Sequence, residues 1–144
     1  MGQVSASSSI VVPADPQRAL EAIADYQTIR PQILTPHYRD YKVIEGGKGA
    51  GTVADWTLQA TEKRSRNVHA TISVSDSMVT ERDSNSTMVT TWTVTPSGTG
   101  SLVTVRTSWK GAGGVPGFFE GIFAPLGLKK IQAQVLENLK SALV

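Results

Sequence analysis

The spacing of hydrophobic residues changes several times along the chain. Residues 4–12 alternate between apolar or small residues and serines, which predicts a strand with one covered face. Asp15 can then cap a short helix that has Pro16 in its first turn, and apolar residues recur behind it at helical spacing. The stretch Thr28–Pro36 contains two prolines, which predicts a second brief helical turn or an irregular segment.

From residue 38 to residue 110 the spacing becomes that of strands. Short segments rich in Gly, Ser, Asn and Pro separate six alternating stretches, and such segments favour antiparallel hairpins. The expected strands are Tyr38–Glu45, Gly51–Ala60, Arg64–Val74, Met78–Asp83, Ser86–Thr95 and Ser101–Lys110. One face of this predicted meander is apolar and the other is rich in Thr and Ser, so one side of the sheet needs a cover.

The last segment of the chain can supply that cover. Apolar residues recur every three or four positions over residues 116–144, which predicts an amphipathic helix of about seven turns. Pro125 and Gly127 interrupt the pattern, so we expect a kink or break near its start. We interpret Leu128–Leu143 as a clamp on the sheet and Phe118–Gly127 as an adjustable lid.

Composition narrows the class of protein. Of the 144 residues, 40% are hydrophobic and 18% are charged, which is ordinary for a globular domain of this length. We therefore expect one domain over residues 1–144. The net charge of +2 is dispersed along the chain, which argues against nucleic-acid binding.

The sequence also suggests a compartment. Cysteine is absent, so the fold cannot depend on disulfides or thiolate-bound metal, and a reducing cytoplasm is allowed. The N-terminus lacks the basic start and apolar run of a secretory signal. Ala6 stands where a myristoylation motif requires Ser or Thr. We expect a cytoplasmic protein without stable membrane insertion, and the sequence leaves its oligomeric state open.

Five short segments carry a resemblance to a known superfamily. They are Ile10–Pro13 before the first helix, Ala24–Tyr26 at its end, the glycine-rich turn Gly46–Gly51, and the strand segments Thr91–Val94 and Val103–Val105. In this order of elements the chain resembles the START/Bet v 1-like (SRPBCC) superfamily, and within it the bacterial polyketide cyclase/dehydrase-like proteins. The resemblance implies an α+β helix-grip fold, in which a curved antiparallel sheet of about seven strands (β-α-α-β6-α) wraps around a long C-terminal helix.

The same resemblance implies a cavity between sheet and helix. Family members use it for lipids, polyketides, sterol-like or other small hydrophobic molecules, some as cyclases or aromatases and others as carriers or sensors. We expect binding or carriage of such a ligand. One alternative is a cyclase or aromatase-like enzyme in which Arg66 or Arg82 polarises a carbonyl while a tyrosine or histidine moves a proton. Another is a protein-interaction module that uses the polar face of the sheet.

The candidate ligand-binding residues come from the expected apolar face, the entrance near the short helices, and the lid. They are Tyr26, Tyr38, Trp56, Leu58, Arg66, Val68, Ala70, Ile72, Met88, Trp92, Val105, Trp109, Phe119, Ile122, Phe123 and Leu126. In the alternating pattern of their strands, Arg66 and Arg82 fall on the same face as apolar neighbours. Either they point into the cavity mouth, where one could bind a carboxylate or carbonyl, or they lie exposed at strand ends. Asp55 and Glu81 fall on the opposite face of their strands, so we expect their side chains in solvent.

Motifs for other chemistry are incomplete. His37 and His69 lie on different segments without metal-ligand spacing, and we expect His69 to be an exposed strand residue. No Gly-x-Ser-x-Gly occurs. The segment Gly111–Gly117 misses the dinucleotide fingerprint by one residue, which favours a flexible hinge. We therefore expect no catalytic residues, no metal and no cofactor.

Overall fold

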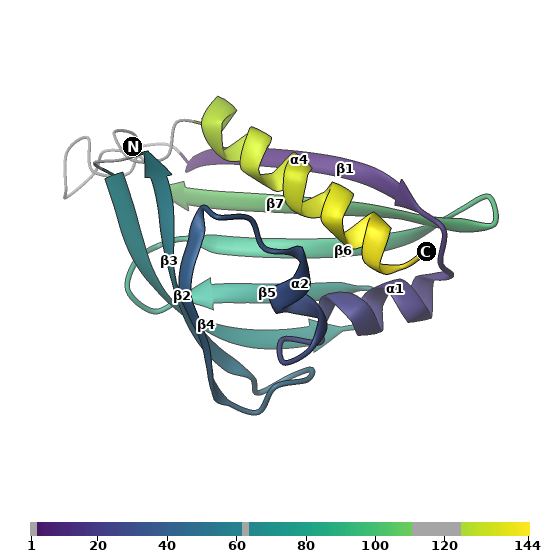
Figure 1. Cartoon of the computed structure of the whole chain (residues 1–144), viewed down its shortest axis with the longest axis horizontal. Helices are drawn as coiled ribbons and strands as arrows, with labels where there is room; N and C mark the ends of the chain where they lie inside the picture. The colour runs from purple at the N-terminus through teal and green to yellow at the C-terminus, as the bar shows by residue number, and fades with distance from the viewer. Residues whose placement is uncertain (1–2, 62–63, 111–124) are drawn as a thin grey trace.

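The computed structural model of the protein describes residues 3–61, 64–110 and 125–144 (Figure 1). Its elements are, in order, β1 (Gln3–Val12), α1 (Pro16–Ile23), α2 (Ile29–Ile33), β2 (Tyr38–Glu45), β3 (Val53–Thr61), β4 (Arg64–Ser75), β5 (Met78–Asp83), β6 (Val89–Ser97), β7 (Gly100–Lys110) and α4 (Pro125–Ala142). The predicted α+β order of strand, two short helices, six strands and a final helix is confirmed. None of the helices in the described ranges has the length and apolar character needed to cross a membrane.

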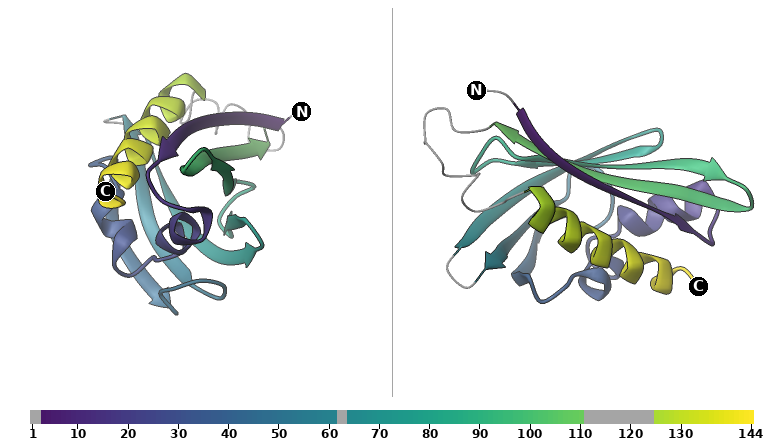
Figure 2. Two further views of the ribbon diagram at one scale, coloured as in Figure 1. Left: turned by 90° about the vertical axis from the view of Figure 1, so that its right-hand side faces the viewer. Right: turned by 90° about the horizontal axis from the view of Figure 1, so that it is seen from above.

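All seven described strands form a single antiparallel sheet. Strands β2 to β7 follow one another as a meander, and β1 pairs with β7, which gives the order β1-β7-β6-β5-β4-β3-β2. The sheet curves, and α4 lies across its concave side, where it packs against β1 and α2 (Figure 2). This is the helix-grip arrangement expected from the sequence.

The first helix starts where its cap predicts. The carboxylate of Asp15 accepts a hydrogen bond from the backbone N–H of Arg18 at 2.8 Å, and Pro16 is the first helical residue. Helix α1 then packs its buried side chains against β5, β6 and β7. Together α1 and α2 lie beside α4 and cover one end of the concave face (Figure 1).

The core lies between the concave face of the sheet and α4. In β7 every second side chain is buried, including the fully buried Val103 and Trp109. From α4 the buried apolar side chains are Leu128, Ile131, Val135, Leu136 and Leu139. Each such side chain contributes about 1.5–3 kcal/mol when fully buried, so this helix is held mainly by its apolar face.

The predicted face of β5 is wrong. We expected Glu81 in solvent and left Arg82 open between the cavity mouth and an exposed strand end, but Glu81 is buried and Arg82 is exposed. The register explains the error, because Glu81 pairs with Ile72 of β4, and directly opposite residues in an antiparallel pair point to the same face. Since Ile72 belongs to the core, Glu81 must enter it too.

The last helix also differs from the prediction. Pro125 is its first described residue and therefore does not kink it. Leu126 is 76% exposed, because it lies about 200° around the helix from the buried Leu128. The predicted helical turns before residue 125, and with them most of the Phe118–Gly127 lid, lie outside the described residues.

Candidate functional site

A cavity lies between the concave face of the sheet, α2 and α4. Its lining consists of Arg30, Leu34, Tyr38, Tyr41, Trp56, Leu58, Glu81, Met88, Thr90, Trp92, Val105, Thr107, Leu128, Gln132 and Val135. Apolar and aromatic side chains dominate this lining, and a few polar groups interrupt it, which is typical of a small-molecule pocket. About 40 Å³ of the space is open to the centres of water molecules, enough for about three of them.

Arg30 of α2 and Glu81 of β5 form an ion pair in the wall of this cavity. Nη1 of Arg30 lies 2.5 Å from Oε2 of Glu81, and the two side chains are only 3% and 7% exposed. The hydroxyl of Tyr26 and the indole N–H of Trp92 donate to the same oxygen at 2.6 and 3.2 Å. A carboxylate can remain charged in the interior with such partners, because they replace the hydrogen bonds that water would make.

The guanidinium of Arg30 is held on several sides. Nη2 donates to the carbonyl oxygen of Ile23 at 2.8 Å, and the central carbon lies 4.1 Å from the ring centre of Tyr26 and 4.9 Å from that of Trp92. Burial by itself would lower the pKa of Arg30, but the neighbouring Tyr26 and Glu81 outweigh it and hold the pKa above its ordinary value. Arg30 is therefore a fixed cation.

Three tyrosines surround the ion pair. Burial raises the pKa of Tyr26 and Tyr38 well above the ordinary value, and it raises the pKa of Tyr41 to about 12. The hydroxyl of Tyr41 donates to the backbone oxygen of Tyr26 at 2.5 Å, and its ring stacks on Trp56 with 6.1 Å between centres. All three phenols are thus neutral donors at neutral pH.

Another polar group of the lining comes from α4. The side-chain amide of Gln132 donates to the carbonyl oxygen of Ala6 at 3.1 Å and to the hydroxyl of Thr107 at 3.3 Å. The hydroxyls of Thr107 and Thr90 lie 2.8 Å apart. Gln132 therefore connects α4 to β1 and β7 through hydrogen bonds and fixes the helix over the cavity.

Comparison with known proteins identifies the family. The profile of the family described as "Polyketide cyclase / dehydrase and lipid transport" matches residues 3–144. The chain belongs to this family. The superfamily resemblance drawn from the sequence is thereby confirmed, and a comparison with curated proteins gave no match.

Solved structures of similar proteins share the fold of this chain. The solution structure of KanY protein (ms6282) is 59% identical, covers 99% of each chain and has a TM-score of 0.91. The protein TTHA0849 from Thermus thermophilus is 16% identical over 97% of each chain, with a TM-score of 0.75. The di-domain ARO/CYC BexL from the BE-7585A biosynthetic pathway is 11% identical, with a TM-score of 0.72 over 98% of this chain and 50% of that chain. The last two show that the fold is shared.

The sequence-predicted site residues of this family member fall into several groups. Those that line the cavity are Tyr38, Trp56, Leu58, Met88, Trp92 and Val105. Those that are buried without lining it are Tyr26, Val68, Ala70, Ile72 and Trp109. Leu126 is exposed and lies away from the cavity, which corrects its predicted inward position. Phe119, Ile122 and Phe123 lie outside the described residues.

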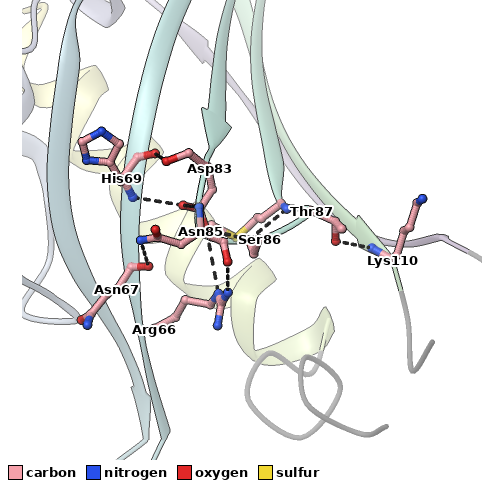
Figure 3. Close-up of polar contacts among 10 residues, drawn as sticks. Arg66, Asn67, His69, Asp83, Asn85, Ser86, Thr87 and Lys110 are labelled. Carbon is pink, nitrogen blue, oxygen red and sulfur yellow. Dashed lines mark hydrogen bonds and ion pairs between the residues drawn. The ribbon is translucent and has the colours of Figure 1, made fainter. Parts of the chain in front are cut away.

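Arg66 belongs to a different cluster, which supports the turn between β5 and β6 (Figure 3). Its Nη2 donates to the backbone oxygen of Asn85 at 2.9 Å, and its Nε lies 3.9 Å from the Asp83 carboxylate. That carboxylate also accepts hydrogen bonds from the backbone N–H groups of His69 and Asn85, both at 3.0 Å, and from the Ser86 hydroxyl at 2.6 Å. Arg66 therefore holds a turn and does not line the cavity.

Asp55 and His69 lie on the convex side of the sheet. Their side chains are 43% and 41% exposed, and Oδ1 of Asp55 lies 2.5 Å from Nδ1 of His69. Both were expected in solvent, and the structure places them half-exposed and paired. Within residues 3–61, 64–110 and 125–144, no three side chains of the His, Cys, Asp and Glu types gather as a metal site would need.

Sequence reasoning missed the polar residues that shape the cavity. Arg30 lies in the segment expected to be a brief helical turn or irregular, where no side chain was singled out, and Glu81 was assigned to the wrong face. Gln132 had a detectable signal, because it stands four residues after Leu128 and four before Leu136, on the apolar side of the helix. A polar residue within such a stripe indicates a buried hydrogen-bond partner.

Proposed function

We propose that the protein binds or carries a small, mainly apolar molecule in the cavity between the sheet, α2 and α4. The observation that carries this proposal is an aromatic and aliphatic lining built around the buried Arg30–Glu81 pair. A polar pair at this depth is costly for a domain that only needs a core, whereas a ligand site uses a few fixed polar groups for orientation. The lipid-transport part of the family description agrees with this function.

The cavity is too small to hold a drug-sized ligand without a change in its lining. Pockets for drug-sized ligands usually measure about 300–1,000 Å³, far more than the 40 Å³ open to water centres here. A ligand larger than a few water molecules must therefore move the lining. Side chains of α4 and of the α2 segment cover the cavity, so these side chains are the ones that must shift to admit it.

The rival functions have less support. The cyclase or aromatase alternative relied on Arg66 or Arg82 within the cavity, but Arg66 holds the β5–β6 turn and Arg82 is exposed. The protein-interaction alternative predicts that a partner still binds when the cavity is blocked. Our proposal keeps the cytoplasm as the compartment, which a chain without cysteine allows.

A fluorescence titration tests the proposal. The neutral dye N-phenyl-1-naphthylamine should bind with a rise in emission, since its emission increases in apolar surroundings. Leu34 lines the cavity, so Leu34→Trp should weaken binding by about tenfold or more through overpacking. Leu20, which is also half-buried but lies on α1 outside the cavity lining, gives the matched control Leu20→Trp. Absence of dye binding, or equal weakening in both variants, would refute the proposal.

A further inference from the structure

The polar capacity of Arg30 is largely used within the protein. Its Nη1 and Nη2 atoms donate to Glu81 and to the Ile23 carbonyl, and its plane lies against two aromatic rings. Its Nε is buried, and no acceptor among the described residues reaches it. Above all, its charge is balanced by Glu81 at 2.5 Å. Arg30 thus positions Glu81 and offers an incoming anion little net attraction.

Glu81 can still accept hydrogen bonds from a ligand. The three hydrogen bonds from Tyr26, Arg30 and Trp92 all end on Oε2, and within the described ranges no hydrogen bond reaches Oε1. A carboxylate oxygen can only accept hydrogen bonds. The phenol of Tyr38 also lines the cavity without a hydrogen bond to another described residue. The cavity therefore presents an acceptor on Glu81 and a neutral phenol on Tyr38.

The charges decide which ligand group fits there. A ligand carboxylate would lose its water shell beside the Glu81 carboxylate, and Arg30 would be already paired. A hydroxyl loses much less on leaving water, and it can donate to Oε1 in a hydrogen bond strengthened by the charge of the acceptor. This differs from the alternative raised from the sequence, in which Arg66 or Arg82 at the cavity mouth binds a carboxylate or carbonyl.

We propose that the cavity selects neutral hydroxyl-bearing apolar molecules, alcohols or phenols, over the matching carboxylates, and that Glu81 is the residue that sets this preference. The inference rests on the proposed function, because it names the ligand class of the same cavity. Glu81 would touch the ligand hydroxyl through Oε1, while Arg30, Tyr26 and Trp92 hold the carboxylate in place through Oε2.

A matched ligand pair tests the preference. At pH 7 2-naphthol is neutral and 2-naphthoate is an anion of the same ring system, since phenols titrate near pH 10 and carboxylic acids near pH 4. Competition with N-phenyl-1-naphthylamine gives both affinities. We expect 2-naphthol to bind about tenfold or more tightly. Equal affinity, or tighter binding of 2-naphthoate, would overturn the inference without any variant being needed.

The variant Glu81→Gln tests the residue. It leaves an oxygen for Tyr26 and Trp92 but removes the counter-charge of Arg30, so the buried cation should now attract 2-naphthoate, and the preference should fall or reverse. Glu137→Gln removes a carboxylate from the exposed side of α4 and should leave the ratio as in the wild type. An unchanged ratio in folded Glu81→Gln would refute the role of Glu81.

The outcomes separate this inference from the proposed function. If neither the dye nor either naphthalene compound binds the wild-type protein, the cavity is not a ligand site and both proposals fail. If the dye binds and 2-naphthol competes no better than 2-naphthoate, ligand binding stands and only the preference is refuted. Circular dichroism of each variant establishes that it is folded before its ratio is used.

Discussion

Nη1 of Arg30 and Oε2 of Glu81 lie 2.5 Å apart although both side chains are more than nine-tenths removed from solvent. Removing one partner leaves an uncompensated buried charge, so Arg30→Met should lower the free energy of unfolding by about 3–5 kcal/mol. The double variant Arg30→Met/Glu81→Leu should cost less than that single change. Urea denaturation measures both values.

The control for this prediction is a surface pair. Arg39 and Asp40 form an ion pair with side chains 54% and 78% exposed, so Arg39→Met should change stability by less than about 1 kcal/mol. If Arg30→Met lowered the free energy of unfolding as little as Arg39→Met, this result would show that water reaches the site of Arg30.

Gln132 gives a prediction for the attachment of α4. Gln132→Leu leaves the Ala6 carbonyl and the Thr107 hydroxyl without this donor, which should cost about 1–3 kcal/mol in unfolding free energy. Gln134→Leu on the exposed side removes only a hydrogen bond to Asn138 and should cost about 0.5 kcal/mol or less. Similar losses in thermal or urea unfolding would argue against a special role of Gln132.

Asp83 should control the β5–β6 turn. Asp83→Ala removes the acceptor for the backbone N–H groups of His69 and Asn85, so these amides should exchange with deuterium faster, and stability should fall by about 1–3 kcal/mol. Asp76→Asn, at the exposed β4–β5 turn, tolerates the positive φ of 34° and should change neither quantity. Unchanged exchange in Asp83→Ala would contradict the turn-holding role.

The raised pKa of Tyr41 leads us to expect a loss of stability at alkaline pH. Burial raises its pKa from the ordinary 10.0 to about 12, against a smaller opposing effect of the Arg30 charge. The folded state therefore holds the proton more tightly than the unfolded state, so this stabilisation is complete below pH 10 and is lost as the pH rises towards 12. Urea unfolding at pH 9, 10 and 11 should show a decline that is shallower in Tyr41→Phe. Equal slopes would exclude this contribution.

Much of the fold is predictable because local patterns determine it. The bounds of β5, Met78–Asp83, follow from alternation between two turns, and the start of α1 follows from Asp15 and Pro16. Such signals lie within a few residues of the element that they define, so they do not depend on tertiary partners.

The polar part of the candidate site depends on distant partners. Arg30 meets a carboxylate 51 residues away, and Gln132 meets a carbonyl 126 residues away. The face of Glu81 is fixed by its register with β4, which a count of alternation within β5 alone assigns wrongly. Aromatic lining residues such as Trp56 and Trp92 were easier to anticipate, because their apolarity alone places them inside.

The pairing of β1 with β7 has a consequence for how the chain is made. Gln3 pairs with Lys110 and Val12 with Ser101, so β1 leaves the ribosome long before its neighbour exists. Translation proceeds at about 5–20 residues per second, so the backbone edge of β1 stays unpaired and accessible to other chains for on the order of 5–20 seconds. The strand contains Ser5, Ser7, Ser8 and Ser9, and these polar residues lower its tendency to aggregate before it is paired. Strand β1 can therefore complete its pairing only after β7 has been synthesised.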